Sequence, residues 1–186
     1  MAQLSQLRRI LRPGMPGASG GVAYLKGKEQ VEANLNKEIE GIRIRSLKGL
    51  IDSAAHIRNK TENAPPLTPR DLGNLIASWF VATATSTPRT EGPHAFKGPH
   101  KAKFESQYAA MISEGRGQMA AMTTKEKKFL MMGYSVNYAG FVHEFISEMT
   151  INWKRPGSGA KWLETHLKAE SGKIVEIIKK DAEVEK

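Results

Sequence analysis

The stretch KEQVEANLNKEIEGIRIRSLKGLIDSAAHIRNK, residues 28–60, decides how the rest of the chain is organised. Its apolar residues recur mostly at steps of three and four, so one side of a helix is apolar while the charged residues fall elsewhere. These apolar positions are Val31, Leu35, Ile39, Ile42, Leu47, Leu50, Ala54 and Ile57. We predict one long helix, which ends before Pro65 because proline disfavours helical geometry in the residue that precedes it.

Outward from this helix, two short runs favour β-strands. Residues 79–85 (WFVATAT) and 129–136 (FLMMGYSV) are apolar, with aromatic and β-branched residues that suit a pleated surface. Residues 138–145 are predicted to follow as a short helix or a bent strand. Residues 153–159 are rich in turn-forming residues and are predicted to be a connector.

A second long amphipathic helix is predicted for residues 160–182, where apolar residues again recur at helical spacing. Gly172 lies inside this helix and weakens it. The order helix, strand, intervening segment, strand, helix predicts an α+β fold. A small antiparallel sheet packed against two long amphipathic helices is its simplest form, because it buries both apolar stripes.

Two further segments lie outside this minimal core. Residues 1–27 are predicted to be an N-terminal arm, because prolines and glycines interrupt any regular structure there. Such an arm either orders against a neighbour or frays. Residues 28–186 are predicted to form the folded domain, with a basic loop insertion at about 87–128. In that insertion, residues 87–106 are predicted to be a loop, and residues 105–122 allow one short helix.

The segment between the first helix and the first strand is predicted to be a capped turn. Thr68 is the expected N-cap, with Pro69 as the first helical residue. Gly73 permits a backbone conformation that residues with a Cβ atom resist, so the chain can turn sharply into the strand. Leu75 and Trp79 are then expected to point into the core.

The residues after the second strand have two interpretations. Tyr138 and Phe141 are expected to cover the edge of the core, while His143 and Glu144 face a neighbouring protein. For each of them, packing within the core is the simpler interpretation.

The composition narrows the class of protein. The net charge is +9 and the isoelectric point is near 9.8, which suits contact with nucleic acid, an anionic membrane or an acidic protein, or serves solubility alone. The absence of cysteine excludes disulfides and thiolate metal sites. Neither a secretory signal nor a run of about 18 apolar residues is present, so we expect no membrane contact.

No arrangement of residues predicts catalysis. His94 and His100 share a basic loop without a carboxylate cluster, which makes them poor metal ligands. His143 and Glu144 are followed by Ser147 where the zinc-protease motif H-E-x-x-H requires a second histidine. Phosphate-loop and serine-nucleophile motifs are missing as well. We therefore expect no enzyme activity, no cofactor and no metal.

Lysines and aromatic residues interleave between Pro88 and Lys128. Such a segment can stack on single-stranded nucleic acid, contact a duplex or a protein partner through charge alone, or remain solvated. If it lines a passage for DNA, six lysines are the candidates to face that DNA: Lys97, Lys101, Lys103, Lys125, Lys127 and Lys128.

Three blocks of sequence resemble, in the same order, the motifs of phage head–tail joining proteins, which are also described as neck, tail-component or tail-completion proteins. The blocks are APPLTPRDLGNLIAS (64–78), GYSVNYAGFVHEF (133–145) and GAKWLETHL (159–167). The likeness spans about residues 30–182. The residues that match the motifs are Asp71, Gly73, Leu75, Ser78, Tyr138, Ala139, Val142, Glu144 and Leu163.

This resemblance implies a structural virion protein of the neck or tail that is assembled in the host cytoplasm. It implies a homo-oligomeric ring, a hexamer or a dodecamer, between the head-closure or connector proteins and the tail terminator or tail tube. Genomic DNA would pass through the ring without sequence-specific contacts. The alternatives are a tail terminator that caps the tail tube and, in another class, a monomeric protein that binds nucleic acid non-specifically.

Overall fold

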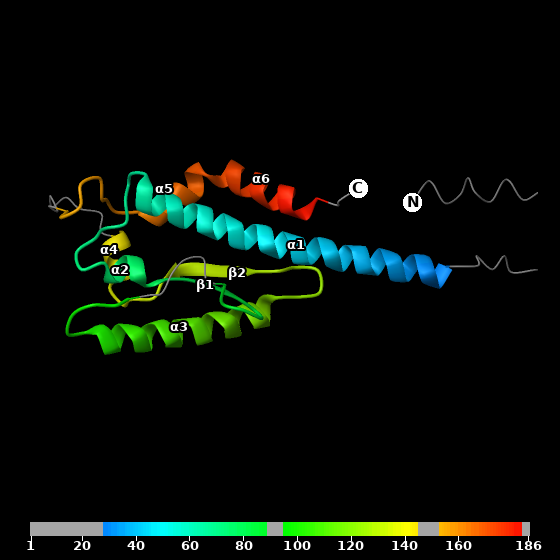
Figure 1. The fold of residues 1–186 in the computed structure, drawn as a ribbon, viewed down its shortest axis with the longest axis horizontal. Helices are drawn as coiled ribbons and strands as arrows, with labels where there is room; N and C mark the ends of the chain where they lie inside the picture. The colour runs from blue at the N-terminus through cyan, green and yellow to red at the C-terminus, as the bar shows by residue number, and fades with distance from the viewer. Residues whose placement is uncertain (1–27, 89–94, 145–152, 184–186) are drawn as a thin grey trace, which may run out of the picture. The chain divides into compact units, whose positions relative to one another are not determined.

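The computed structural model describes residues 28–88, 95–144 and 153–183 (Figure 1). The described residues form helices and one antiparallel two-stranded sheet, which confirms the predicted α+β class. The chain divides into two compact units between Asn36 and Lys37, and the contacts below lie in the second unit. The elements are α1 (Lys28–Asn63), α2 (Asn74–Ala77), β1 (Trp79–Thr83), α3 (Lys101–Met122), β2 (Leu130–Tyr134), α4 (Ala139–Glu144), α5 (Trp162–Ala169) and α6 (Ser171–Ala182).

One face of the sheet packs on the C-terminal part of the first long helix, where Ala54 and Ile57 of the predicted apolar stripe are buried, whereas Val31 and Leu35 of that stripe are exposed. The strands are antiparallel, with Trp79 opposite Tyr134, and their side chains alternate between the two faces. Trp79 and Val81 pack with Ala54 and Ile57 of α1 in one buried cluster. Partly buried residues of the last two helices complete this cluster: Leu163 and Leu167 from α5, and Ile174 from α6.

The other face of the sheet is covered by α3, so the sheet lies between α3 and α1 (Figure 1). A Cβ atom on Gly115 of α3 would lie 3.1 Å from Met131 Sδ and 3.4 Å from Ala82 Cβ. The prediction of a loop through residue 106, followed by only a short helix, is wrong, because α3 is one helix of 22 residues. Its contact with the sheet uses a glycine, which apolar periodicity does not detect.

The C-terminal helix is also divided where the sequence predicts one element. The break lies at Glu170, directly before Ser171 and Gly172, and glycine–serine pairs are common sites of helix kinks. Beyond the break, α6 approaches α1 so closely that a Cβ atom on Gly49 would lie 2.8 Å from Ile178 Cα. The predicted weak point at Gly172 is therefore within two residues of the observed break.

The segment after α1 keeps the predicted end but not the predicted cap. The helix ends at Asn63, before the two prolines, as expected. Thr68 is not an N-cap, because α2 begins only at Asn74 and the Thr68 hydroxyl lies against the hydroxyl of Tyr134. Gly73 has a φ of 89°, in the left-handed region, as predicted, but it turns the chain into α2 and not directly into the strand.

The remaining elements differ from the predictions mainly at their ends. β1 stops at Thr83, whose hydroxyl donates to the carbonyl oxygen of Ser86 and so closes a turn. Residues 139–144 form a helix, one of the two predicted alternatives. Leu75 and Trp79 are buried, as predicted. Phe141 does not cover the core edge, because 69% of its surface is exposed.

Predictions for residues outside the described ranges stay predictions. The N-terminal arm, residues 1–27, lies outside the described residues, as do residues 145–152 and His94. In the described part of the chain, no helix combines the length and the hydropathy that crossing a membrane requires.

The place of α3 in the core can be tested at its two glycines. Replacing Gly115 with leucine should lower the free energy of unfolding by about 1–3 kcal/mol, because the new side chain has to displace Met131 and Ala82. Gly117 is the matched control, since a Cβ atom there meets nothing within 4 Å. Gly117→Leu should stabilise the protein by up to about 1 kcal/mol through helix propensity. Urea denaturation followed by circular dichroism measures both, and equal effects at the two sites would show that α3 does not pack on the sheet.

Candidate functional site

An open groove of about 420 Å³ lies where the segments before α2 and α3 meet α4 and the connector at residues 153–154. Leu75 and Phe104 are buried at its apolar floor, and Tyr138 and Val142 complete that floor. Several of the residues that match the family motifs line this groove: Asp71, Gly73, Leu75, Tyr138 and Val142. The structure therefore brings together motif residues that lie far apart in the sequence.

Aromatic rings hold the floor of the groove in place. The ring of Phe104 lies 5.9 Å from those of both Phe96 and Tyr138, at angles typical of tilted and edge-to-face pairs. Burial raises the pKa of Tyr138, and the negative charge of Asp71 raises it further. The Tyr138 phenol is thus neutral at physiological pH, and the floor carries no charge.

Asn74 joins two walls of the groove, and the sequence reasoning missed it. Its side-chain nitrogen donates to the carbonyl oxygen of Lys97 at 3.0 Å, and its side-chain oxygen accepts from the backbone N–H of Lys97 at 2.7 Å. The buried side chain thereby replaces the pairing that a strand would provide. Its position after Gly73, at the start of a helix, is the only sequence signal that points to it.

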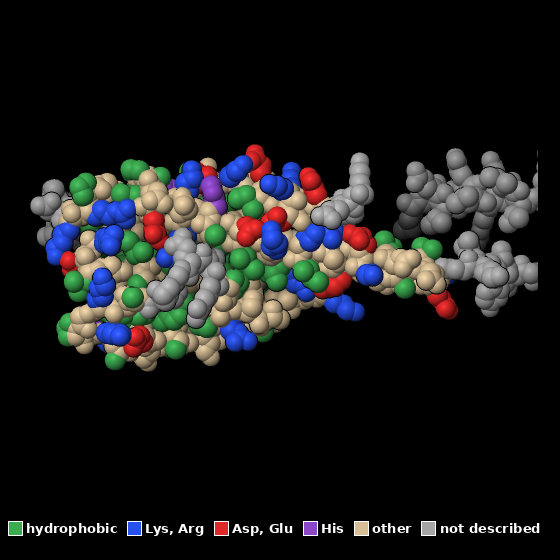
Figure 2. Space-filling model, viewed as in Figure 1, with side chains coloured by type: hydrophobic (Ala, Val, Ile, Leu, Met, Phe, Trp, Pro, Cys, Tyr) green, Lys and Arg blue, Asp and Glu red, His purple; other side chains and the backbone are tan. Residues whose placement is uncertain are grey.

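The rim of the groove is basic. Arg70, Lys97 and Lys154 are exposed there, and the single carboxylate, Asp71, pairs with Lys154 at 2.5 Å. Figure 2 shows Lys and Arg side chains gathered over the end of the fold that carries α2, α4 and the start of α3.

The other motif residues support this end of the fold. The Ser78 hydroxyl donates to the carbonyl oxygen of Leu75 at 2.7 Å, and Ala139 and Leu163 belong to the core around the groove. Glu144 accepts a hydrogen bond from Lys161 and pairs with His143, and these contacts hold the pKa of Glu144 below its usual range. That His143 and Glu144 face a neighbouring protein stays a prediction.

The six candidate DNA-facing lysines do not form one patch. Lys97, Lys101 and Lys103 lie at the start of α3, whereas Lys125, Lys127 and Lys128 follow its end. A helix of 22 residues separates the two groups by about 33 Å. Lys101 pairs with Glu105, and Lys128 pairs with Glu40, each at 3.7 Å.

The histidines in the described residues take part in hydrogen bonds, ion pairs or packing contacts within the fold. His166 is buried, and its Nε2 lies 3.0 Å from the carbonyl oxygen of Ala64. His56 pairs with Glu170 at 2.8 Å, and the ring of His100 packs on Phe104. Over residues 28–88, 95–144 and 153–183, no group of three or more His, Asp or Glu side chains is placed to hold a metal ion.

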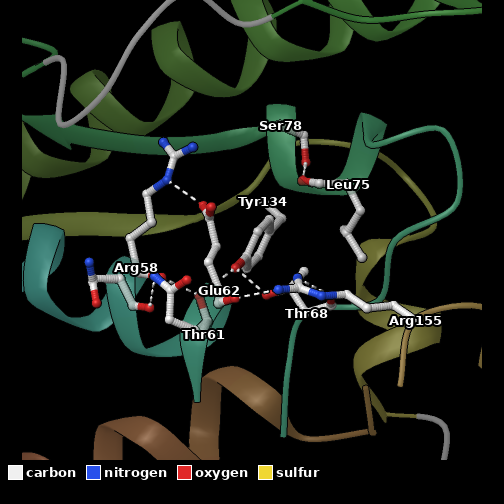
Figure 3. Close-up of polar contacts among 10 residues, drawn as sticks. Arg58, Thr61, Glu62, Thr68, Leu75, Ser78, Tyr134 and Arg155 are labelled. Atoms are coloured by element: carbon white, nitrogen blue, oxygen red, sulfur yellow. Dashed lines mark hydrogen bonds and ion pairs between the residues drawn. The ribbon is translucent and has the colours of Figure 1, made fainter. Parts of the chain in front are cut away.

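A buried polar network joins β2 to α1 and to the segment that follows α1 (Figure 3). The Tyr134 hydroxyl lies 3.0 Å from Thr68 Oγ1 and 3.2 Å from Thr61 Oγ1. Arg155 donates to the carbonyl oxygens of Glu62 and Thr68, which closes the segment after α1 onto the connector before α5. Burial raises the pKa of Tyr134, so its hydroxyl stays protonated and can donate to one of the threonines.

This network yields a stability prediction. Tyr134→Phe should lower the free energy of unfolding by about 1–3 kcal/mol, because two buried threonine hydroxyls lose a partner. Tyr138→Phe is the control, since the Tyr138 hydroxyl makes no hydrogen bond within the described residues, and it should change stability by less than about 0.5 kcal/mol. Urea denaturation measures both variants, and similar losses would mean that the Tyr134 hydroxyl does not hold these segments together.

The three motif blocks contact one another directly. Leu67 of the first block accepts from Gly159 of the third at 3.4 Å, and Ser135 of the second donates to Ser78 of the first at 2.9 Å. The third block is joined to the second by the Lys161 N–H, which donates to the carbonyl oxygen of His143 at 2.8 Å. Comparisons with protein-family models, with curated proteins and with solved structures found no match to this chain.

Proposed function

We propose that this protein is a non-catalytic structural subunit of a tailed-phage neck, in which copies form a ring that joins the head connector to the tail and lets DNA pass. The observation that carries the proposal is the contact among the three motif blocks. Residues 64–78 and 133–144 include several that line the groove, and residues 159–167 are hydrogen-bonded to both segments. If the likeness to the three short motifs arose by chance, there would be no reason for the matching segments to contact one another.

Two different apolar surfaces support assembly into a ring. A closed ring needs a heterologous interface, in which one face of each copy meets a different face of the next. Phe141 of α4, which is 69% exposed and does not line the groove, offers one such surface. A second hollow of about 220 Å³ lies beside the α3–β2 turn, lined by residues that include Leu47, Phe129 and the exposed Ile44.

The basic charge supports passage of DNA. With a net charge of +9, the subunit attracts phosphate groups without reading sequence. Lysines at the surface, which are not buried among other side chains, contact phosphates only transiently. DNA is therefore able to slide past them. In the proposed ring, one or both of the lysine groups at the ends of α3 face the lumen.

The nearest alternative is a tail terminator, a hexamer that caps the tail tube. A monomeric, non-specific nucleic-acid-binding protein is the alternative from another class, and the oligomeric state separates it from both rings. Binding to purified head connectors or to tail tubes separates the two ring proteins from each other.

The ring proposal predicts that the full chain sediments as a closed hexamer or dodecamer, with a ring visible by electron microscopy. Ile44→Glu should shift the population toward monomers, because it places a charge in an apolar contact. Ile44→Met is the matched control, and it should leave the assembly intact. Since 61% of the Ile44 surface is exposed, neither change should alter the helix content measured by circular dichroism. A monomer at every concentration, with or without virion partners, would refute the ring.

The lumen hypothesis predicts binding to duplex DNA that weakens steeply with salt, because each neutralised phosphate releases counterions. Changing Lys125, Lys127 and Lys128 to glutamine should reduce the slope of log affinity against log salt by up to about 3 if all three contact phosphates. The same test applies to the lysine group at the start of α3. The matched control replaces three exposed lysines of α6, which are Lys173, Lys179 and Lys180.

Fluorescence anisotropy with labelled duplexes measures these slopes. Binding that does not depend on salt, or no binding at low salt, would remove DNA contact from the proposal. An equal loss of slope in the α6 control would show that net charge alone is responsible.

A further inference from the structure

The groove beside α2 and α4 combines two chemistries that suit one kind of occupant. Its rim carries three cations, Arg70, Lys97 and Lys154, against the single carboxylate of Asp71. Within the described residues, the only ion pair of this group joins Asp71 to Lys154. The rim thus has an excess of two positive charges, and the matching partner is anionic.

The floor requires an apolar group from the same partner. Leu75, Phe104, Tyr138 and Val142 present carbon atoms to the hollow, and 54% of the Leu72 surface is exposed at the edge. Removing such surface from water is favourable, by about 25 cal/mol for each Å² that is covered. A phosphate backbone has no apolar side chain to supply, so duplex DNA meets the rim but leaves the floor exposed.

The walls of the groove are already fixed without an occupant. Asn74 binds the backbone of Lys97 through both atoms of its amide group. Gly98, the next residue, has a φ of 81°, and a Cβ atom there would lie 3.3 Å from Leu72 Cδ1. A preformed site loses little conformational entropy on binding, which favours recognition of a short, flexible segment.

We infer that this groove binds a peptide segment of a partner protein that carries carboxylates beside one or two large apolar side chains. A volume of about 420 Å³ is in the range of sites that enclose such groups. The apolar side chain enters between Phe104 and Val142, and the carboxylates pair with Arg70 and Lys97 at the rim. The inference deepens the proposed function, on which it rests for the source of the peptide: a neighbouring virion protein in the stack.

Trp153 provides a direct readout of binding. The chain has three tryptophans, of which Trp79 and Trp162 are 1% and 0% exposed, while Trp153 lines the groove. A synthetic peptide of Asp and Glu residues around a Leu-Phe pair, without tryptophan, is the probe. Added to the full chain, it should change the Trp153 emission until the site is saturated. In Trp153→Phe the emission change should disappear, while isothermal titration calorimetry still detects binding.

Two matched peptides and two matched variants test the chemistry. The probe with Lys in place of its acids, and the probe with Ser in place of Leu-Phe, should each bind at least about tenfold more weakly. Lys97→Glu should weaken binding of the acidic probe by about tenfold or more, because it reverses a rim charge. Lys103→Glu makes the same change in net charge on α3, away from the groove lining, and should have little effect.

The outcomes separate this inference from the ring. If the acidic probe does not bind, or binds no better than either matched peptide, the groove is not a site of this kind, whatever sedimentation shows. If Lys97→Glu and Lys103→Glu weaken binding equally, the interaction reflects net charge and the inference fails. If self-assembly of the chain alone changes the Trp153 emission and blocks the probe, a second copy fills the groove and the partner peptide is excluded. Probe binding by a chain that stays monomeric at every concentration, with or without virion partners, supports the groove while removing the ring.

Discussion

The structure depends on a sheet that needs cover on both faces. Two strands of five residues are marginal in water by themselves, so β1 and β2 persist only with helices packed on each side. The face that carries Trp79 and Val81 packs on Ala54 and Ile57 of α1 together with α5 and α6. The opposite face takes α3, and the close approach at Gly115 allows that helix to lie directly on the strands.

Tyr134 links this packing to the groove. It ends β2, its ring makes edge-to-face contacts with Trp79 and Trp162, and it packs against both buried clusters. Its hydroxyl reaches the threonines on either side of the two prolines after α1. The segment from α1 to α2 is therefore held against the sheet by a polar contact. Residues 69–75 of that segment line the groove, so the groove's geometry depends on the same tyrosine.

The groove gives the motif residues a physical interpretation. Gly73 turns the chain into α2, Leu75 forms part of the floor, and Tyr138, directly before α4, and Val142 of α4 complete that floor. Around this apolar floor, the basic rim attracts anionic groups and the fixed walls limit their position. A subunit with such a groove at one end and an apolar hollow beside the α3–β2 turn is equipped for contacts with neighbours of two kinds.

The sequence by itself determined the elements whose side chains follow a strong period: α1, both strands and the helical C-terminal region. It also determined the turn at Gly73 and the burial of Leu75 and Trp79, because glycine before a helix and large apolar residues leave few alternatives. Only the tertiary structure decided that α3 is a core helix, since its contact with the sheet uses Gly115 rather than an apolar stripe. It also decided the role of Thr68, where a buried tyrosine hydroxyl from a distant strand replaced the local helix cap. The groove too was decided by the tertiary structure, because Asn74, Lys97 and Lys154 become neighbours only when the separate segments pack together.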